Sequence, residues 1–222
     1  MAAGDGRSRR PAPQSRRELE VRASALSGRR VADIVAGLGW ALPLEPVRAK
    51  GFVGQLVEAA LGADPKAGCR PDFPQLAIEL KTVPIGRHGR PAESTFCCSV
   101  NMAAADREEW ESSRLKQRIA CVLWMPVEAA AVASLPERRF GAHRLWAPSP
   151  EQLDALRADW EDLIGAIGTG NAPTANQGRL LQVRPKAASS RDRTLAPGAG
   201  GPQRTLPLGF YLRSSFVTEI LT

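Results

Sequence analysis

Three residues in the first half of the chain have the types and spacing of a hydrolytic centre. Asp72 follows a proline, Glu79 comes seven residues later, and Lys81 follows after one intervening leucine. Side chains alternate between the two faces of a strand, so Glu79 and Lys81 would project together while Ile78 and Leu80 enter the core. The flanking apolar residues predict a central strand of the sheet. Burying a Glu and a Lys there costs free energy unless each has a partner or contact with water. Asp72, in the preceding loop, can come round to the same edge.

Two carboxylates and an ammonium group at one point suit metal-assisted hydrolysis of a phosphodiester. Carboxylate oxygens hold Mg²⁺, which lowers the pKa of a bound water and stabilises charge on the phosphate oxygens. Lys81 would orient or deprotonate the attacking water, and Glu58, on the preceding helix, could join the same acidic cluster. The alternative is that Glu79 and Lys81 lie on an exposed strand face with cross-strand partners. The spacing alone is a weak pattern and leaves both interpretations open.

The elements that would position these residues follow from the hydrophobic spacing and the turn residues. The pattern predicts helices over 17–38 (broken at 27–28), 51–61, 108–121 and 148–167. It predicts strands over 76–83, 94–100, 122–127 and 180–183, a hairpin turn at 86–91 joining the first two, loops at 62–71 and 185–205, and a last segment, 209–221, that begins as a strand or turn and ends helical. This mixture indicates an α/β or α+β fold. Residues 1–17, rich in Arg, Pro and Gly, are predicted to be a flexible basic tail. The tail could add weak affinity for DNA, but a simple unconstrained N-terminus is the favoured explanation.

Composition narrows the function classes. The net charge of +7 favours a polyanionic partner such as nucleic acid, but 25 of the 30 cations are Arg, a bias that can reflect genomic base composition instead. No segment approaches the roughly 20 apolar residues that span a bilayer, and the first residues lack the apolar core of a secretory signal. We therefore expect a cytoplasmic protein. Four Cys without CxxC spacing and only two His argue against a zinc site, so any metal would be held by oxygen.

A resemblance extends over nearly the whole chain. It is carried by 51–58 (GFVGQLVE), 61–63 (LGA), 72–73 (DF), 79–84 (ELKTVP), 89–91 (GRP), 93–96 (ESTF), 110–111 (WE), 122–124 (VLW), 126–128 (PVE), 145–146 (LW), 159–161 (DWE), 181–188 (LQVRPKAA), 206–207 (LP) and 209–212 (GFYL). In order and spacing these motifs resemble the MutH mismatch-repair endonucleases, relatives of GATC-cutting type II restriction enzymes within the PD-(D/E)xK nuclease fold. Only the basic tail falls outside.

The resemblance implies a fold and an activity. The fold would be α/β, a mixed sheet with flanking helices, restriction-endonuclease-like, with residues 18–222 forming two lobes around a DNA cleft and a catalytic core at about 48–130. The family nicks the unmethylated strand of hemimethylated GATC sites 5′ to the G with Mg²⁺, and is activated by MutL, which mismatch-bound MutS loads. Asp72 and Glu79 would be metal ligands, Lys81 would assist the nucleophilic water, and Glu58 would join the cluster. Lys50 matches a family lysine near the active site.

DNA recognition is predicted at two further places. Arg184 and Lys186 flank Pro185, which restricts the backbone between two cations; in isolation this is a solvated loop, but it coincides with the DNA-contacting loop of the family. Tyr211, the only tyrosine, matches the family residue that senses adenine methylation, although core packing is an alternative. Phe96 is a weaker candidate for a DNA contact.

The predicted basic helix would supply phosphate contacts. It carries Arg114, Lys116 and Arg118, with cations at i and i+4 on one face. The family pattern there is richer in Lys and His, and basic residues would also be expected where this chain has Asn176 and Gln177. These departures put individual phosphate contacts in doubt, not the catalytic assignment.

Three functions remain to be distinguished. The first is a monomeric, strand-nicking endonuclease of methyl-directed mismatch repair. The second is a GATC-specific type II restriction endonuclease of the same fold, which needs a second active site for the other strand. The third is a non-catalytic protein that binds DNA or MutL, against which the complete set of Asp72, Glu79 and Lys81 argues.

Overall fold

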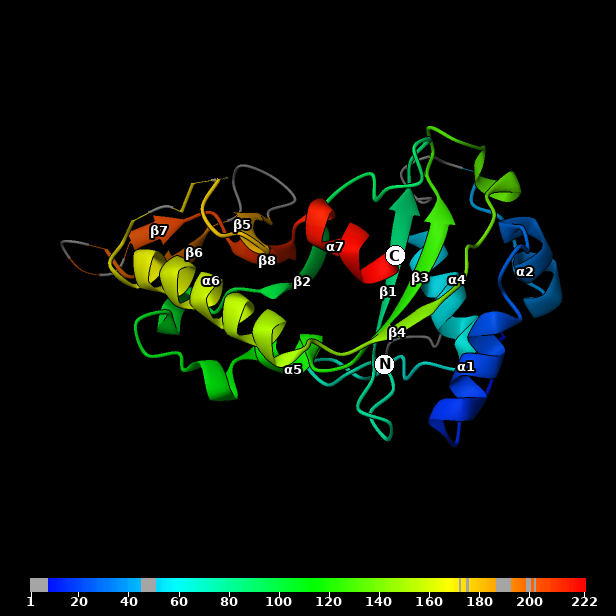
Figure 1. Ribbon diagram of the computed structural model, residues 1–222, viewed down its shortest axis with the longest axis horizontal. Coiled ribbons are helices and arrows are strands. Elements are labelled where there is room, and N and C mark those ends of the chain that lie inside the picture. Colours follow the sequence, from blue (N-terminus) through cyan, green and yellow to red (C-terminus); the bar gives the residue numbers. More distant parts are fainter. Residues whose placement is uncertain are drawn as a thin grey trace. The chain divides into compact units, whose positions relative to one another are not determined.

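The chain forms two compact units. The computed structural model describes residues 8–44, 51–171, 173–174, 176–186, 193–198, 201 and 203–222. Unit 1 comprises Met1–Ala92 and Cys121–Trp146, and unit 2 comprises Glu93–Ala120 and Ala147–Thr222. Figure 1 shows the elements of both. Each unit is described by itself, and the mixed helices and strands of both confirm the predicted α/β class.

The described part of unit 1 begins with helices in the positions that the apolar spacing predicts. They are α1 (Arg16–Ser24), α2 (Val31–Leu38) and α4 (Phe52–Leu61). Ser15 caps α1 by accepting the backbone N–H of Glu18, and glycines in the left-handed conformation end α2 and α4. The inward faces of all three helices meet in one apolar core that includes Leu19, Ile34 and Leu56.

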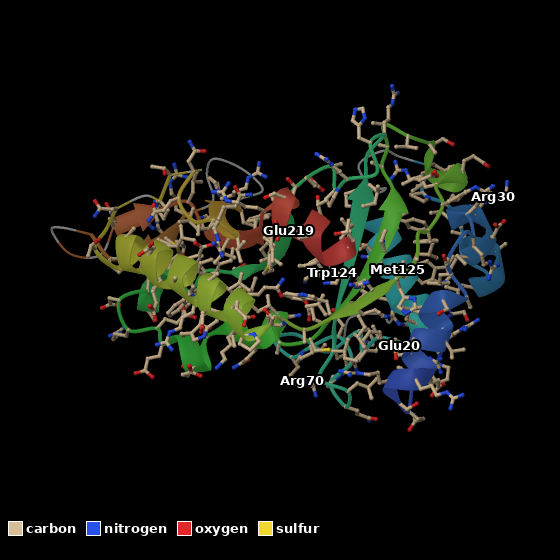
Figure 2. The ribbon with its side chains drawn as sticks, viewed as in Figure 1. Glu20, Arg30, Arg70, Trp124, Met125 and Glu219 are labelled. Atoms are coloured by element: carbon tan, nitrogen blue, oxygen red, sulfur yellow. The ribbon has the colours of Figure 1, made fainter. Side chains whose placement is uncertain are left out.

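The sheet of unit 1 has the strand order β1-β3-β4. Its strands are β1 (Glu79–Ile85), β3 (Val122–Glu128) and β4 (Arg144–Trp146), β1 and β3 being parallel and β4 antiparallel to β3. Trp124 and Met125, neighbours on β3, are both fully buried, so this middle strand is covered on both faces (Figure 2). The prediction that the strand bearing Glu79 is central was therefore wrong. Its apolar residues are covered by the core that includes α4, and β1 is an edge strand among the described residues.

Strand β1 begins three residues later than predicted, because the residues before it form a tight turn. Phe73 and Ile78 exchange backbone hydrogen bonds of 2.9 and 3.3 Å across this turn. Within it Ala77 has a φ of 54°, the only positive φ of a non-glycine residue in the described part of the chain. The turn brings Asp72 back beside the first residues of β1.

The predicted turn at 86–91 forms, with the Gly86 N–H donating to the Arg90 carbonyl at 2.8 Å, but it does not join the first two strands in a hairpin. After Ile85 the chain turns back only as far as Ala92, whose N–H donates to the Pro84 carbonyl at 2.8 Å. The next strand, β2 (Thr95–Ser99), belongs to unit 2 and pairs with β8. An alternating pattern identifies a strand but not its partner, which accounts for the error.

Unit 2 is built on a second sheet of order β2-β8-β5. Its elements after β2 are η1 (Met102–Ala104), η2 (Trp110–Ser112), α5 (Arg114–Ile119), α6 (Pro150–Gly168), β5 (Leu181–Pro185), β6 (Thr194–Ala196), β7 (Gln203–Thr205), β8 (Leu208–Leu212) and α7 (Ser214–Leu221). Buried Asp159 on α6 accepts the backbone N–H groups of residues 179–181 at 2.8, 2.6 and 2.8 Å, which positions the start of β5.

Two predictions in unit 2 need correction. The helix expected over 108–121 is a 3₁₀ turn followed by the short α5, because Ser113 is extended and caps the N–H of Lys116. The loop expected over 185–205 contains the β6–β7 hairpin. Short strands without strong alternation leave no clear signal in the sequence.

The basic tail predicted over 1–17 is ordered in its described part. Trp40 donates its indole N–H to the Ser8 carbonyl at 2.8 Å, and the N–H of Arg10 donates to the Ala59 carbonyl at 2.9 Å. Pro13 is buried, and α1 begins at Arg16. Residues 8–17 are therefore part of unit 1, and residues 1–7 lie outside the described part. No described helix is long and apolar enough to cross a membrane.

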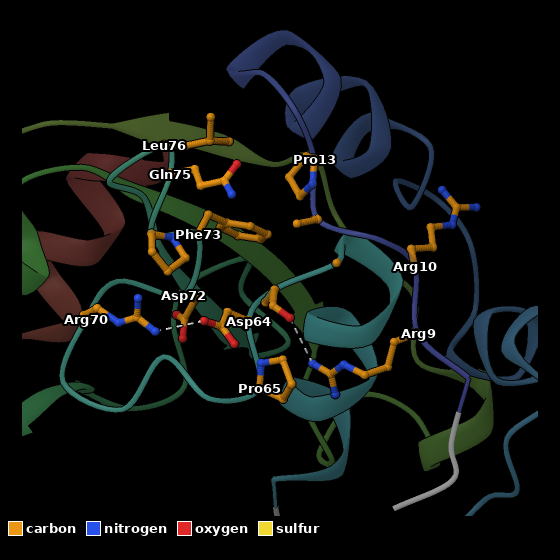
Figure 3. Close-up of a pocket in the computed structure, with 14 residues that line it drawn as sticks. Arg9, Arg10, Pro13, Asp64, Pro65, Arg70, Asp72, Phe73, Gln75 and Leu76 are labelled. Atoms are coloured by element: carbon orange, nitrogen blue, oxygen red, sulfur yellow. Dashed lines mark hydrogen bonds and ion pairs between the residues drawn. The ribbon is translucent and has the colours of Figure 1, made fainter. Parts of the chain in front are cut away.

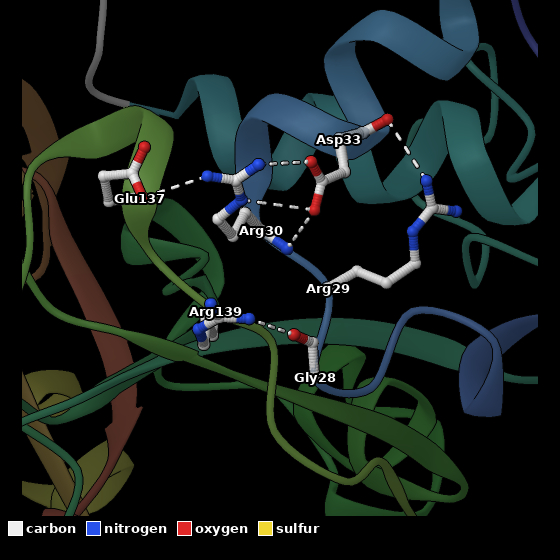
Figure 4. A network of polar contacts seen from close by, with 6 residues as sticks. All are labelled: Gly28, Arg29, Arg30, Asp33, Glu137 and Arg139. Carbon is white, nitrogen blue, oxygen red and sulfur yellow. Dashed lines mark hydrogen bonds and ion pairs between the residues drawn. The ribbon is translucent and has the colours of Figure 1, made fainter.

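Several arginines of unit 1 form ion pairs and hydrogen bonds within the protein, which engages their charge in the fold. Arg30, at the start of α2, pairs with Asp33 at 3.1 Å and with Glu137 at 3.3 Å (Figure 4). The hydrogen bonds of Arg30 hold the pKa of Asp33 below its ordinary value. Arg139 donates to the Gly28 carbonyl at 2.8 Å, which ties the same region together. The net charge therefore overstates the cations that are free to meet a polyanion.

The strained turn before β1 generates a prediction. A left-handed backbone costs a residue with a Cβ about 1–2 kcal/mol, and glycine carries no such cost. Ala77→Gly should relieve this strain but should also increase the entropy of the unfolded chain, which offsets part of the gain. The net effect should be a rise of about 0.5 kcal/mol in the free energy of unfolding, measured by urea titration. Ala36→Gly, on the exposed side of α2, is the control and should lower it by about 1 kcal/mol. Equal losses in both variants would contradict the strain at Ala77.

Candidate active site

The residues that the sequence selects for catalysis meet in unit 1 at the start of β1. The N–H of Leu80 donates to Asp72 Oδ2 at 2.8 Å, which attaches the preceding loop to the strand. Glu79 and Lys81 project from the same side of β1, as the alternation predicts, and Lys81 Nζ lies 2.6 Å from Glu79 Oε1. The alternative of an exposed strand face is therefore wrong, since the side chain of Glu79 is 2% exposed and that of Lys81 17%.

Burial makes the Glu79–Lys81 pair interdependent. A charge removed from water is costly, and removing one partner of a buried pair leaves the other uncompensated. Lys81 is therefore the charged partner of a carboxylate that has almost no contact with water. It also retains some contact with solvent, so an incoming group can reach it.

Glu58 supplies a third carboxylate from α4. Burial is the main cause that raises the pKa of Glu58 above its ordinary value, and the charge of Asp72 raises it further. The charge of Glu79 acts in the same direction, whereas the cations Arg9 and Lys81 lower the pKa. Glu58 thus belongs to one electrostatic group with Asp72 and Glu79, as the sequence predicts.

This group has the chemistry of a hard-cation site. It offers carboxylate oxygens, the ligands that Mg²⁺ prefers, and their mutual repulsion would fall when a cation binds. The described residues contain no cluster of three or more Asp, Glu, His or Cys already drawn together as a metal site. Asp72 and Glu79 are instead held by a backbone N–H and by Lys81. The donor set fits Mg²⁺, while binding would require these side chains to adjust. Lys50, also predicted near this site, lies outside the described residues.

A second candidate site lies on the sheet of unit 2. Tyr211 on β8 is flanked by Phe96 on β2 and by Gln182 on β5. The rings of Phe96 and Tyr211 meet edge to face with centroids 5.3 Å apart. Arg184 lies 5.7 Å from the Tyr211 ring centroid, and Lys186 Nζ lies 3.0 Å from that of Phe96. Two cations and two aromatic rings therefore gather on one face, an arrangement suited to phosphates and base edges.

Two residues of this cluster were missed in the sequence. Ser94 accepts a hydrogen bond from Arg184 at 3.0 Å, which fixes one orientation of the guanidinium. Gly209 has no room for a Cβ, which would lie 2.9 Å from the Phe96 ring and 3.2 Å from that of Tyr211. The glycine two residues before Tyr211, on the same face of the strand, was the available signal.

Burial also affects Tyr211. It raises the pKa of the phenol above its ordinary value, with the charge of Arg184 acting in the opposite direction. Tyr211 is half-buried, so it is neither a simple core residue nor fully exposed. Its hydroxyl stays protonated at neutral pH and can donate a hydrogen bond.

The three basic residues of α5 differ in exposure and in their contacts within unit 2. Arg114 is exposed, Lys116 forms an ion pair with Glu111, and Arg118 is half-buried. The ammonium of Lys116 is thereby partly neutralised. A role for these residues in binding phosphate stays a prediction.

Comparison with known proteins identifies the family. The family model described as "DNA mismatch repair enzyme MutH" matches residues 61–159. The DNA mismatch repair protein MutH of Yersinia enterocolitica is 44% identical over 214 residues, covering 94% of this chain and 93% of that protein. That of Vibrio cholerae is 43% identical over 217 residues, covering 96% and 97%. The chain belongs to the MutH family.

Family membership agrees with the site in unit 1. MutH proteins are mismatch repair endonucleases with a restriction-endonuclease-like fold, so a nuclease centre is expected. The matched region, 61–159, contains the Asp72–Glu79–Lys81 set at the start of β1. Glu58 and the cluster around Tyr211 lie outside that region but inside the span shared with the MutH relatives, which covers nearly the whole chain.

The position of Glu58 generates a prediction about pH. Its pKa is higher in the folded chain than in the unfolded one, so its ionisation opposes folding. This penalty is absent below the unfolded-state pKa and fully present above the folded-state pKa. Glu58→Gln should therefore raise Tm at mildly alkaline pH, and the gain should shrink as the pH falls towards 4.5, the ordinary value for a glutamic acid.

The control for this experiment is Glu219→Gln, which removes one negative charge from an exposed position of α7. Thermal unfolding of all three proteins across the pH range measures the effect. A gain from Glu58→Gln that is independent of pH would contradict the proposed origin of the raised pKa.

Proposed function

We propose that this chain is a Mg²⁺-dependent endonuclease of methyl-directed mismatch repair. It nicks the unmethylated strand of double-stranded DNA at hemimethylated GATC sites, 5′ to the G, as a monomer activated by MutL downstream of MutS. The grouping of Asp72, Glu79 and Lys81 at the start of β1 carries the proposal. Membership of the MutH family supports it.

The residues of unit 1 divide the chemistry among them. Asp72 and Glu79 would hold Mg²⁺, which when bound supplies an activated water and neutralises charge on the phosphate. Lys81, 2.6 Å from Glu79, orients the attacking water and balances the negative charge that develops on the phosphate oxygens. Glu58 adds a third carboxylate to the electrostatic group and so increases its attraction for a divalent cation.

Two conservative variants test this division. In Asp72→Asn the amide oxygen can still accept the Leu80 N–H, but one negative charge is lost. In Lys81→Arg the ion pair with Glu79 is retained, but the compact ammonium group is replaced by a planar guanidinium. Each should reduce Mg²⁺-dependent nicking by at least about 100-fold while binding of a GATC duplex persists. Normal nicking of hemimethylated DNA by either variant would refute the mechanism.

Recognition is assigned to the cluster on the sheet of unit 2. Arg184 and Lys186 would contact a guanine edge or nearby phosphates, and Phe96 and Tyr211 would contact the DNA beside them. The Tyr211 ring can lie against adenine N6, where it admits an amino group and excludes an added methyl group by steric clash. The ring contacts of Arg184 and Lys186 support a preformed recognition surface.

Two variants of Tyr211 separate the ring from the hydroxyl. Tyr211→Ser removes the ring and should reduce the preference for the unmethylated strand by on the order of tenfold, because the steric exclusion of a methyl group is lost. Tyr211→Phe keeps the ring and should retain most of the preference. Relative nicking rates on the two hemimethylated forms of one duplex provide the measurement. Unchanged discrimination in Tyr211→Ser would remove this residue from the recognition step.

The same assay separates the competing functions. A type II restriction endonuclease of this fold would cut both strands without MutL. A non-catalytic protein would bind the duplex and leave it intact at every Mg²⁺ concentration.

A further inference from the structure

The described N-terminal residues have a defined path along the surface of unit 1, beside the proposed catalytic carboxylates. We call residues 8–14 the N-terminal strap. It crosses the end of α4, where Arg22 Nη1 donates to the Pro11 carbonyl at 2.6 Å and to the Leu61 carbonyl at 2.9 Å. Gly62 permits the crossing, since a Cβ there would lie 2.2 Å from the Pro11 oxygen. The path of the strap is thus determined by specific contacts.

A cavity lies between the strap and the catalytic loop. Its volume is about 370 Å³, within the range of ligand-binding clefts, and its lining includes Asp72 itself (Figure 3). Phe73 and Leu76 contribute apolar surface, and Arg9 and Arg70 contribute cations. One wall of the cavity is therefore a catalytic carboxylate and another carries positive charge.

Arg9 is the cation that the strap holds in this position. Its Nη2 donates to the Ala63 carbonyl at 3.3 Å, so its hydrogen-bond acceptor is neutral. The next residue, Arg10, also lines the cavity, but its side chain turns the opposite way from that of Arg9 (Figure 3). The charge of Arg9 also acts on Glu58, whose pKa it lowers, so it belongs to the electrostatics of the catalytic group.

The two aspartates of the cavity would not prevent an anion from binding. Asp64 is compensated by Arg70 at 3.1 Å and by the Lys66 N–H at 2.8 Å. Asp72 accepts the Leu80 N–H and would be neutralised further by a bound divalent cation. The two aspartates that line the cavity are therefore already engaged by other groups.

We propose that this cavity binds a backbone phosphate adjacent to the scissile one, with Arg9 of the N-terminal strap as its ligand. The inference rests on the proposed nuclease function, because DNA cleaved beside Asp72 must place its neighbouring phosphates near this lining. The apolar surface of Leu76 would pack against the deoxyribose. Arg9 would then help position the DNA strand for in-line attack and would take no part in the chemical step itself.

The test compares Arg9→Gln with Arg10→Gln, which removes the same charge from the same strap. Affinity for a hemimethylated GATC duplex is measured without Mg²⁺ over a range of salt concentrations. Arg9→Gln should weaken binding about 5- to 10-fold and reduce the slope of log affinity against log salt by about 1, as expected for one lost phosphate contact. Arg9→Lys keeps the positive charge and should therefore show most of the wild-type salt dependence. If Arg9 only supported the structure of the strap, keeping the charge alone would not restore that dependence.

A cycle with modified DNA locates the contact. Single phosphates flanking the scissile one are replaced in turn by uncharged methylphosphonates. At one of these positions the substitution should weaken binding of the wild-type protein and have little further effect on Arg9→Gln. Additive losses at every position, or equal effects of Arg9→Gln and Arg10→Gln, would overturn the proposal. A wild-type protein that neither binds nor nicks GATC duplexes would instead refute the proposed function.

The strap itself can be displaced independently. Gly62→Ala would force the strap away from α4, and binding should weaken as it does in Arg9→Gln. Gly39→Ala is the matched control, since Gly39 has a similar φ of 67° but no atom within 4 Å of the added Cβ. Equal DNA affinity in the two glycine variants would contradict a role for the strap.

Discussion

A buried carboxylate at the first position of β1 is the constraint on which unit 1 depends. Glu79 is 1% exposed, and a charge so far from water requires a compensating partner. Lys81 provides it from two residues along the same strand, at 2.6 Å. Replacing such a pair with apolar residues often costs little stability or even increases it, so stability alone does not account for a buried ion pair. A centre that must bind a cation and a phosphate does account for it.

The surrounding structure brings further charge to the same place. The turn from Phe73 to Ile78, with its strained Ala77, returns the chain so that Asp72 receives the Leu80 N–H. Helix α4 adds Glu58, whose pKa is raised mainly by burial and further by the charges of Asp72 and Glu79. Strained backbone and like charges held together are typical of sites where function is favoured over stability. These features, with membership of an endonuclease family, make the start of β1 the centre of the proposed chemistry.

The local features of this site could be predicted from the sequence, because they follow from spacing along one strand or one helix. The common side of Glu79 and Lys81 is a consequence of alternation, and α4 follows from its apolar spacing and its flanking glycines. The partner of β2 could not be predicted, since pairing across the chain is decided by tertiary packing. The strap was also missed. Its Arg and Pro content is typical of a disordered tail, and its order comes from contacts with Trp40, Arg22 and Gly62.

The most direct test of the central claim is strand-resolved cleavage of one hemimethylated GATC duplex by the wild-type protein with MutL, at increasing Mg²⁺. If the carboxylates at the start of β1 form a metal-dependent nuclease centre, no product forms without Mg²⁺. A single nick, 5′ to the G of the unmethylated strand, then appears as the cation is added. Cleavage that is equally fast in the presence of a chelator, or no cleavage at any Mg²⁺ concentration, would contradict the account.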